Sequence, residues 1–218
     1  MAAPTLLACT AEQSAQIFQP AGQVALLRVI NASTPVLNVL VDGVTVAGPF
    51  QYGDASNCLT VNSREPKLAA KWGAVTSVFQ GTFADGEQAY LVAAAWGSGA
   101  GAVYWTVRVP RDTVTGTPAR LRVMNISGAG PYDAYLTPPN SPLGTPSATA
   151  IATGDVVAPF DIAPGEWNVR LTDAGTQTVA LDLGNRQFEG SKREMLVIAP
   201  PDTGSSAIRT FFWSASCP

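Results

Sequence analysis

The sequence predicts an all-β protein built from two tandem immunoglobulin-like β-sandwiches, preceded by an extended N-terminal segment. Three observations predict this fold: a set of sequence blocks that occurs twice, short runs of alternating apolar and polar residues rich in β-branched and aromatic types, and Gly or Pro turn signals between the runs. Gly and Pro also interrupt every window that could carry a 3.6-residue apolar period, so we expect no long helix.

The duplication is visible in the order of the blocks. Segment 28–33, Arg-Val-Ile-Asn-Ala-Ser, reappears at 122–127 as Arg-Val-Met-Asn-Ile-Ser. A Gly-Asp pair follows in both copies, and a late apolar run occurs at 89–93 and again at 194–198. Since every block keeps its place, we interpret the chain as one domain written twice.

The predicted domain organisation follows from these repeats. Residues 1–23 form an N-terminal extension, 24–110 the first sandwich, 111–118 a linker and 119–218 the second sandwich. Each repeat contains about seven short strands, the number typical of an immunoglobulin sandwich. The linker is short, so we expect two rigidly apposed domains.

Composition excludes several function classes. The chain of 218 residues has no histidine and only 13% charged residues, with a net charge of −3. Without histidine it cannot form a Ser-His-Asp or Cys-His catalytic site or a zincin motif, and a weakly acidic chain is not steered to nucleic acid. We therefore expect no enzyme, no metal and no cofactor. The sequence also has no run of about 20 apolar residues that could span a membrane.

Three cysteines, Cys9, Cys58 and Cys217, allow one disulfide to be drawn in three ways. We favour Cys9–Cys58, because this bond would tie the N-terminal extension to the first domain, and Cys217 would then be free or paired between chains. The alternative is three reduced thiols. A low-charge chain rich in Thr, Ser and Gly fits an oxidising compartment, which predicts an extracellular or cell-envelope location.

Two repeated polar positions each have a structural and a functional interpretation. Asn31 and Asn125 fit the glycosylation pattern Asn-x-Ser, but Asn at a strand end more often bonds nearby backbone and sets a turn. Asp54 and Asp155 follow glycine at equivalent places and could be ion ligands. Neither repeat supplies the several nearby carboxylates of a calcium loop, so we favour turn-capping aspartates.

Two further features are candidate contact sites. Trp96 stands beside a glycine-rich stretch at 97–101, which makes it the best candidate for an aromatic ligand-binding contact on a loop. The residues Thr5, Leu6, Leu7 and Ala8 belong to an apolar N-terminal tail of a kind that frays unless it is packed. We expect this tail to lie on its own domain or to assemble with another chain as an added strand.

The pattern Arg-Val-x-Asn-x-Ser, followed by a strand ending in Val-Asp-Gly and then by Gly-Asp, resembles the bacterial domain-of-unknown-function family 4397. The resemblance covers roughly residues 24 to 214. It implies a secreted or surface-anchored protein with one or two immunoglobulin-like units, and it implies no catalytic residue. The second repeat carries the Pro-Gly turn at 163–165, whereas the first has Asn-Ser-Arg-Glu-Pro at 62–66.

These observations predict a non-catalytic extracellular or cell-surface structural or adhesion protein. One form of this function is a filament or coat subunit that assembles through its N-terminal segment, with protein partners or further copies of itself. A carbohydrate- or peptide-binding module that uses Trp96 and the Pro-rich loop 137–146 is the alternative, with glycans as partners. A carboxylate-based hydrolase, which needs two converging acids, is the third hypothesis.

Overall fold

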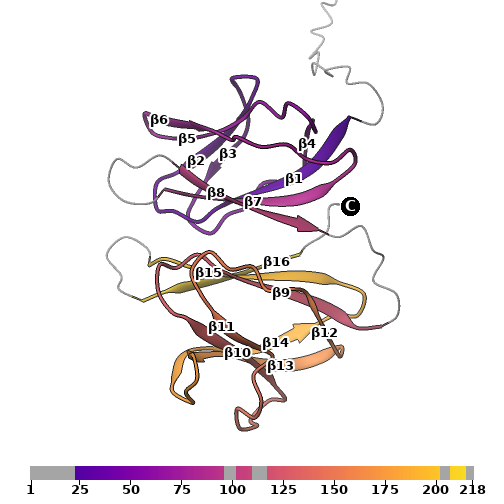
Figure 1. Ribbon diagram of the computed structural model, residues 1–218, viewed down its shortest axis with the longest axis vertical. Helices are drawn as coiled ribbons and strands as arrows, with labels where there is room; N and C mark the ends of the chain where they lie inside the picture. Colours follow the sequence, from indigo (N-terminus) through magenta and orange to yellow (C-terminus); the bar gives the residue numbers. More distant parts are fainter. Residues whose placement is uncertain (1–22, 96–101, 110–116, 202–206, 215–218) are drawn as a thin grey trace, which may run out of the picture.

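The computed structural model describes residues 23–95, 102–109, 117–201 and 207–214. These ranges contain sixteen β-strands and no helix, which confirms the all-β prediction (Figure 1). Accordingly, no helix with the length and apolarity needed to cross a membrane occurs in these ranges.

The first repeat is a sandwich of two four-stranded sheets. Its strands are β1 (Val24–Asn31), β2 (Leu37–Val41), β3 (Val44–Phe50), β4 (Leu59–Asn62), β5 (Leu68–Trp72), β6 (Val75–Val78), β7 (Gln88–Ala95) and β8 (Ala102–Val109). One sheet has the order β4-β1-β7-β8 and the other β3-β2-β5-β6. The β1–β7 pair is parallel, and every other neighbouring pair is antiparallel.

The second repeat has the same topology. Its strands are β9 (Ala119–Asn125), β10 (Tyr132–Thr137), β11 (Ala148–Ile151), β12 (Phe160–Ile162), β13 (Gly165–Asp173), β14 (Val179–Phe188), β15 (Arg193–Ala199) and β16 (Arg209–Ser214). The sheet orders are β12-β9-β15-β16 and β11-β10-β13-β14, with β9 and β15 parallel. The two tandem sandwiches predicted from the repeated blocks are therefore present.

Each sandwich has eight strands, one more than the roughly seven strands that the sequence predicts for each repeat. Its first two strands lie in opposite sheets, whereas strands A and B of an immunoglobulin domain share a sheet. The immunoglobulin likeness therefore lies in the sandwich architecture and not in the strand order. The corresponding edge strands β6 and β14 differ in length, with four and ten residues, and β6 follows β5 through a tight turn at Gly73.

The predicted hairpin at Asp42-Gly43 connects β2 to β3. Asp42 and Gly43 have φ angles of 51° and 79°, the two positive values that a type I′ turn requires. This turn matches the right-handed twist of the two strands that it joins. The Asp-Gly dipeptide therefore predicts this local structure correctly.

Each sandwich buries alternate residues of its strands in a core between its own two sheets. In the first repeat Leu27 and Val29 of β1 pack against Leu37 and Val39 of β2, and all four are at most 1% exposed. The second repeat builds its core in the same way, with Leu121 and Val123 of β9 among its members. These positions show the period of two that the sequence predicts.

A third apolar core lies between the two repeats. The sheet β4-β1-β7-β8 faces the sheet β12-β9-β15-β16, so the molecule is a stack of four sheets (Figure 1). The interface core consists of these buried residues: Ile30, Ala32, Tyr90, Val92 and Val107 from the first repeat, and Met124, Ile126, Met195, Val197 and Ala199 from the second. The two central sheets are thus buried on both faces.

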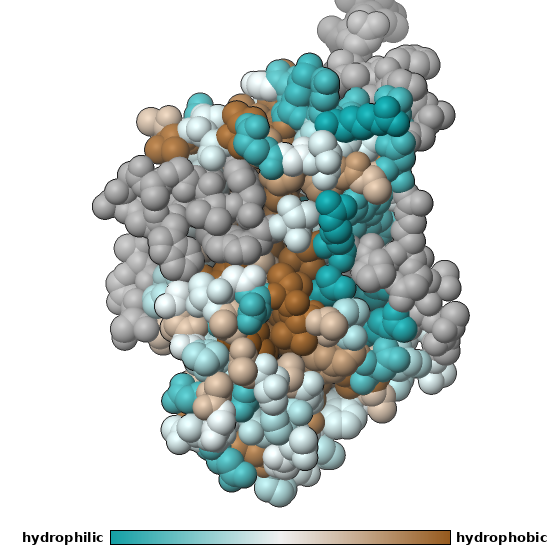
Figure 2. All heavy atoms as spheres, in the orientation of Figure 1, coloured by the Kyte–Doolittle hydropathy of each residue, from teal (hydrophilic) through white to brown (hydrophobic). Residues whose placement is uncertain are grey.

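The outermost sheet of the first repeat presents apolar side chains to solvent. Val44 and Val46 lie on edge strand β3, and Val75 and Val78 lie on the opposite edge strand β6, with exposed fractions between 47% and 65%. Figure 2 shows apolar atoms among polar ones at this end of the molecule, and more apolar surface near mid-height. Exposed apolar edge strands are features that proteins use to associate.

Candidate functional site

The repeated motif places a buried asparagine at the end of the first strand of each sandwich. Asn31 Nδ2 donates hydrogen bonds to Pro35 O at 3.0 Å and Phe50 O at 3.1 Å, and Asn31 Oδ1 accepts bonds from the backbone N and the hydroxyl of Ser33. Asn31 is 0% exposed. Its side chain thus ties β1 to the turn before β2 and to the end of β3.

Asn125 repeats this network in the second sandwich. Its Nδ2 donates to Ala129 O at 3.0 Å and Ile151 O at 2.9 Å, and its Oδ1 accepts bonds from Ser127 N and Oγ. Because the amide that would carry a glycan is buried and donates two hydrogen bonds, both asparagines act as turn-setting residues in the folded chain. The structural interpretation of the Asn-x-Ser motif is therefore the correct one.

The repeated aspartates cap tight turns. Asp54 Oδ2 accepts a 2.8 Å bond from Gln51 N, and Asp155 Oδ2 accepts one of the same length from Ala152 N. Within the described ranges, no three His, Cys, Asp or Glu side chains are grouped so that they could hold a metal ion. These aspartates therefore set loop geometry next to the two asparagines.

The arginine of the repeated Arg-Val-x-Asn-x-Ser motif donates a hydrogen bond to the other repeat in both copies. Arg28 Nη1 donates to Ser214 O of β16 at 3.0 Å, and Arg122 Nη1 donates to Arg108 O of β8 at 2.9 Å. Strand pairing shows that these acceptors are equivalent, since Ala89 pairs with Arg108 in the first repeat and Glu194 pairs with Ser214 in the second. The interface is thus pseudo-symmetric, like an isologous contact within one chain.

Two tyrosines, Tyr90 within the interface core and the partly buried Tyr52 packed against it, add polar contacts between the repeats. The Tyr90 hydroxyl donates to Ser214 O, and the Tyr52 hydroxyl donates to Pro200 O. The Tyr52 ring also meets Phe211 edge-on, with ring centroids 5.1 Å apart. Both hydroxyls join a first-repeat side chain to second-repeat backbone, so they fix how the two sandwiches sit against each other.

The environment of Tyr90 predicts a loss of stability in alkali. Burial raises the pKa of Tyr90 well above its ordinary value near 10, against a smaller opposing effect of Arg28. The unfolded chain releases this proton near pH 10 while the folded chain keeps it. The free energy of unfolding should therefore fall as pH rises above about 10, by up to about 1.4 kcal/mol per pH unit.

Denaturant titrations at pH 8 to 11 would measure this slope in the parent and in Tyr90→Phe. We expect a shallower slope in the variant, with some slope remaining because burial also raises the pKa of Tyr132. Equal slopes in the two proteins would contradict the assignment.

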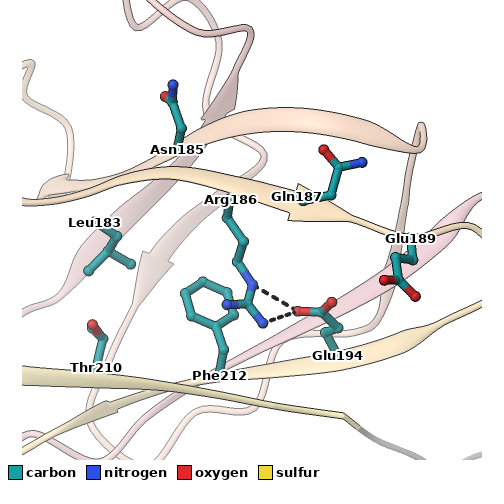
Figure 3. A pocket seen from close by; sticks show the side chains of 8 residues that line it. All are labelled: Leu183, Asn185, Arg186, Gln187, Glu189, Glu194, Thr210 and Phe212. Carbon is teal, nitrogen blue, oxygen red and sulfur yellow. Dashed lines mark hydrogen bonds and ion pairs between the residues drawn. The ribbon is translucent and has the colours of Figure 1, made fainter.

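A polar groove of about 630 Å³ opens on the side of the second sandwich, and we call it the edge groove. It lies between edge strand β14 and the strands β15 and β16 of the other sheet (Figure 3). Its lining consists of Leu183, Asn185, Arg186, Gln187, Glu189, Glu194, Thr210 and Phe212. Amide, hydroxyl and carboxylate groups thus surround one aromatic ring.

An ion pair closes the inner wall of the edge groove. Arg186 Nε and Nη2 donate to Glu194 Oε2 at 2.9 and 2.7 Å, and the guanidinium carbon lies 3.9 Å from the centroid of the Phe212 ring (Figure 3). Arg186 therefore covers the ring face that could otherwise stack on a sugar. This cluster joins the two sheets of the sandwich and leaves Glu189 and the amide side chains at its rim.

A second groove, of about 490 Å³, occupies the equivalent place in the first sandwich, between β6 and β8. Strand pairing puts Thr106 where the edge groove has Phe212, since Leu91 pairs with Thr106 and Leu196 with Phe212. Here Arg108 forms an ion pair with Glu87, 2.6 Å from Nη1 to Oε1. The two grooves share a position but differ in chemistry, so no single ligand is expected to fit both.

Most of the sequence-predicted sites lie outside the described residues. This holds for Trp96, for Thr5, Leu6, Leu7 and Ala8, and for Cys9 and Cys217. Cys58 is half-buried just before β4, with its Sγ 3.9 Å from Arg28 Nη2. The ligand, assembly and disulfide assignments made for these residues therefore stay predictions.

Sequence reasoning did not identify the arginines Arg28 and Arg122 as the residues of the motif that bond across the interface. A signal for them was available: the chain has only 13 Lys and Arg residues, and Arg28 and Arg122 are two of them at equivalent positions inside apolar strands. The Arg186–Glu194 pair carried no comparable signal, because its partners come from different sheets.

Comparison with known proteins agrees with the resemblance in the sequence. A family model described as "Domain of unknown function (DUF4397)" matches residues 25–135, which span the first sandwich from the second residue of β1 onward, all of β9 and the first four residues of β10. No curated protein matches the chain. Because the family model covers just over half of the sequence, the chain belongs to the DUF4397 family of domains of unknown function.

Proposed function

We propose that this protein is a non-catalytic structural or adhesion module of the extracellular space or cell envelope, whose two sandwiches act as one rigid block. The observation that carries the proposal is the apolar core shared by the repeats. Domain interfaces within a chain are usually polar and permit relative motion. Here Ile30, Met124 and Val197 are 0% exposed at the contact.

The energetics of the contact support rigidity. Each fully buried aliphatic side chain of this size stabilises the closed arrangement by about 1.5–3 kcal/mol. Arg28 and Arg122 each donate a hydrogen bond to a backbone carbonyl of the other repeat, and these bonds favour one relative orientation of the two sandwiches. A block that holds two sandwiches in fixed relation suits a protein that transmits force or presents a surface, and the predicted oxidising compartment suits the same role.

The outer sheet of the first repeat is the surface that we assign to assembly. Its edge strands β3 and β6 carry the four exposed valines, and each is the last strand of the sheet among the strands that the structure describes. An extended apolar segment such as Thr5–Leu6–Leu7–Ala8 of another copy has the chemistry to add to such an edge. This pairing would build a head-to-tail filament.

Light scattering after size-exclusion chromatography, together with electron microscopy, tests the assembly. The full chain should form oligomers or fibres. Deletion of residues 1–20 or the substitution Val78→Lys should reduce the assemblies to monomer. Val179→Lys on β14, at a valine of similar exposure in the other sandwich, is the control and should leave them unchanged. A full chain that stays monomeric at every concentration would overturn the filament form of the proposal.

The alternative functions can be tested at the edge groove, where Glu189 and Glu194 both contribute to the lining. A carboxylate hydrolase needs two acids in one cleft. Turnover of chromogenic glycosides or esters that is lost in Glu189→Gln would overturn the non-catalytic assignment. Saturable glycan binding that is lost in the same variant would favour the binding-module function.

A further inference from the structure

We propose that the edge groove binds an extended segment of a partner protein, which carries a lysine or arginine and adds as a further strand beside β14. The proposal is independent of the proposed function, because the assembly surface assigned there is the outer sheet of the first sandwich. Either proposal can fail while the other holds.

Strand β14 borders the groove along its edge. It is the last strand of its sheet among the strands that the structure describes, and with ten residues it is the longest of them. Three consecutive residues, Asn185, Arg186 and Gln187, line the groove (Figure 3). Since successive side chains of a strand point to opposite faces, a groove that all three reach borders the edge itself. Along such an edge every second residue directs its backbone N–H and C=O outward, toward an added strand.

The inner wall of the groove leaves space for the side chains of such a strand. Thr210, Phe212 and Glu194 come from the other sheet, so the groove lies between the two sheets of the sandwich. Every second side chain of an added strand would point inward over these residues. The volume of about 630 Å³ falls within the range of about 300–1,000 Å³ that is usual for ligand pockets. Arg186, held by Glu194 and Phe212, keeps this wall in place before a ligand arrives.

The charge of the groove favours a basic ligand. Its charged lining residues are Glu189, Glu194 and Arg186, with a net charge of −1. Arg186 and Glu194 form an ion pair with each other, whereas Glu189 is exposed and has no ion pair with any residue that the structure describes. Figure 3 shows Glu189 and Glu194 at the same end of the groove. A lysine or arginine of the incoming segment would therefore lie at this end, and an acidic side chain would be repelled.

The groove of the first sandwich does not have this chemistry. Its lining includes Arg108, and none of the residues that line it is acidic. The edge strand beside it, β6, has four residues, compared with ten in β14. Two sandwiches of the same topology thus differ in the length and the charge of this edge, and only the second fits a basic strand.

Selection from a displayed library of random peptides of about nine residues, close to the length of β14, tests the proposal with the full chain as the target. We expect the enriched peptides to carry a lysine or arginine at one fixed position. Enrichment without a basic residue, or no enrichment, would overturn the proposal. Enriched peptides that match a segment of this chain would make the occupant a second copy, and would overturn the assignment to a partner protein.

Methylation of the backbone nitrogens of a selected peptide, one at a time, separates strand addition from binding through side chains alone. In an added strand only every second N–H bonds to β14. The Kd, measured by fluorescence anisotropy, should therefore rise by about tenfold or more at alternate positions and change little between them. Similar effects at neighbouring positions, or no effect at any position, would contradict strand addition.

Charge-reversal variants locate the binding site on the protein. Glu189→Lys should weaken binding of the selected peptide by about tenfold, because it places a like charge beside the basic side chain. Glu65→Lys is the matched control, since Glu65 is an exposed glutamate of the first sandwich and the net charge changes by the same amount. This control should bind like the parent protein. Equal losses in the two variants would indicate a nonspecific effect of charge and would overturn the assignment to the edge groove.

Discussion

Replacing Asn31 with alanine should lower the free energy of unfolding by about 3–5 kcal/mol, although the residue is polar and stands at a turn. The part-buried carbonyls of Pro35 and Phe50 would lose their donor, and the buried Ser33 hydroxyl would lose its acceptor. Each buried polar group left without a partner costs about 1–3 kcal/mol. Denaturant unfolding followed by tryptophan fluorescence measures the change.

The same experiment reports on the shared core. Asn31 lies in the first sandwich, yet we expect one cooperative transition that moves as a whole, because the interface core couples the two repeats. Asn62→Ala is the control: Asn62 accepts bonds from the backbone of Arg64 and Glu65 near the surface, and its loss should cost about 1 kcal/mol. Two separate transitions, or equal losses for Asn31 and Asn62, would contradict this account.

The fold could be predicted because its signals are local and occur twice. The Asp42-Gly43 turn, the alternation in β1 and the recurring Arg-Val-x-Asn-x-Ser motif each specify short-range geometry. Duplication doubles this information, since a pattern that is ambiguous in one copy is supported by the other. The two sandwiches therefore follow from the sequence alone.

The interface between the repeats could not be predicted in the same way, because it depends on which sheet faces which. Its trace in the sequence is a lack of alternation: the run Tyr90-Leu91-Val92 in β7 is apolar at every position, as is Met195-Leu196-Val197 in β15. Strands with continuous apolar runs are buried on both faces. In β7, Leu91 enters the core of its own sandwich, while Tyr90 and Val92 enter the interface core.

The edge groove shows a different limit. Arg186, Glu194 and Phe212 come from three strands, and their contact depends on the distance between two sheets at an open edge. No spacing along the chain encodes that distance. Sequence reasoning therefore placed the aromatic contact at Trp96, on the only criterion available to it, which is a loop position beside glycines.

Substitution of Gly53 with alanine should be far more destabilising than the same change at Gly154, its counterpart in the second repeat. Both glycines have left-handed backbone, with φ of +89° and +95°, which costs an alanine about 1–2 kcal/mol. At Gly154 an added Cβ meets nothing within 4 Å. At Gly53 it would stand 2.3 Å from Cε1 of Phe211, a side chain of the other repeat.

Phe211 has little room to yield, because its ring packs between Tyr52 and Trp213 with centroids 5.1 and 5.2 Å away. Forcing extra volume into such a contact costs about 1–3 kcal/mol more. We therefore expect a loss of about 3–5 kcal/mol for Gly53→Ala and about 1–2 kcal/mol for Gly154→Ala, measured by denaturant unfolding.

A double-mutant cycle separates the contact with Phe211 from the backbone effect. In a Phe211→Ala background the Gly53→Ala change should cost only about 1–2 kcal/mol, because the ring it would strike is gone while the left-handed backbone remains. The difference is the energy with which this turn of the first sandwich contacts the last strand of the second. If the losses in free energy of unfolding from the two single substitutions simply add in the double variant, the turn at Gly53 is not in tight contact with Phe211. The rigid-block proposal would then lose this support.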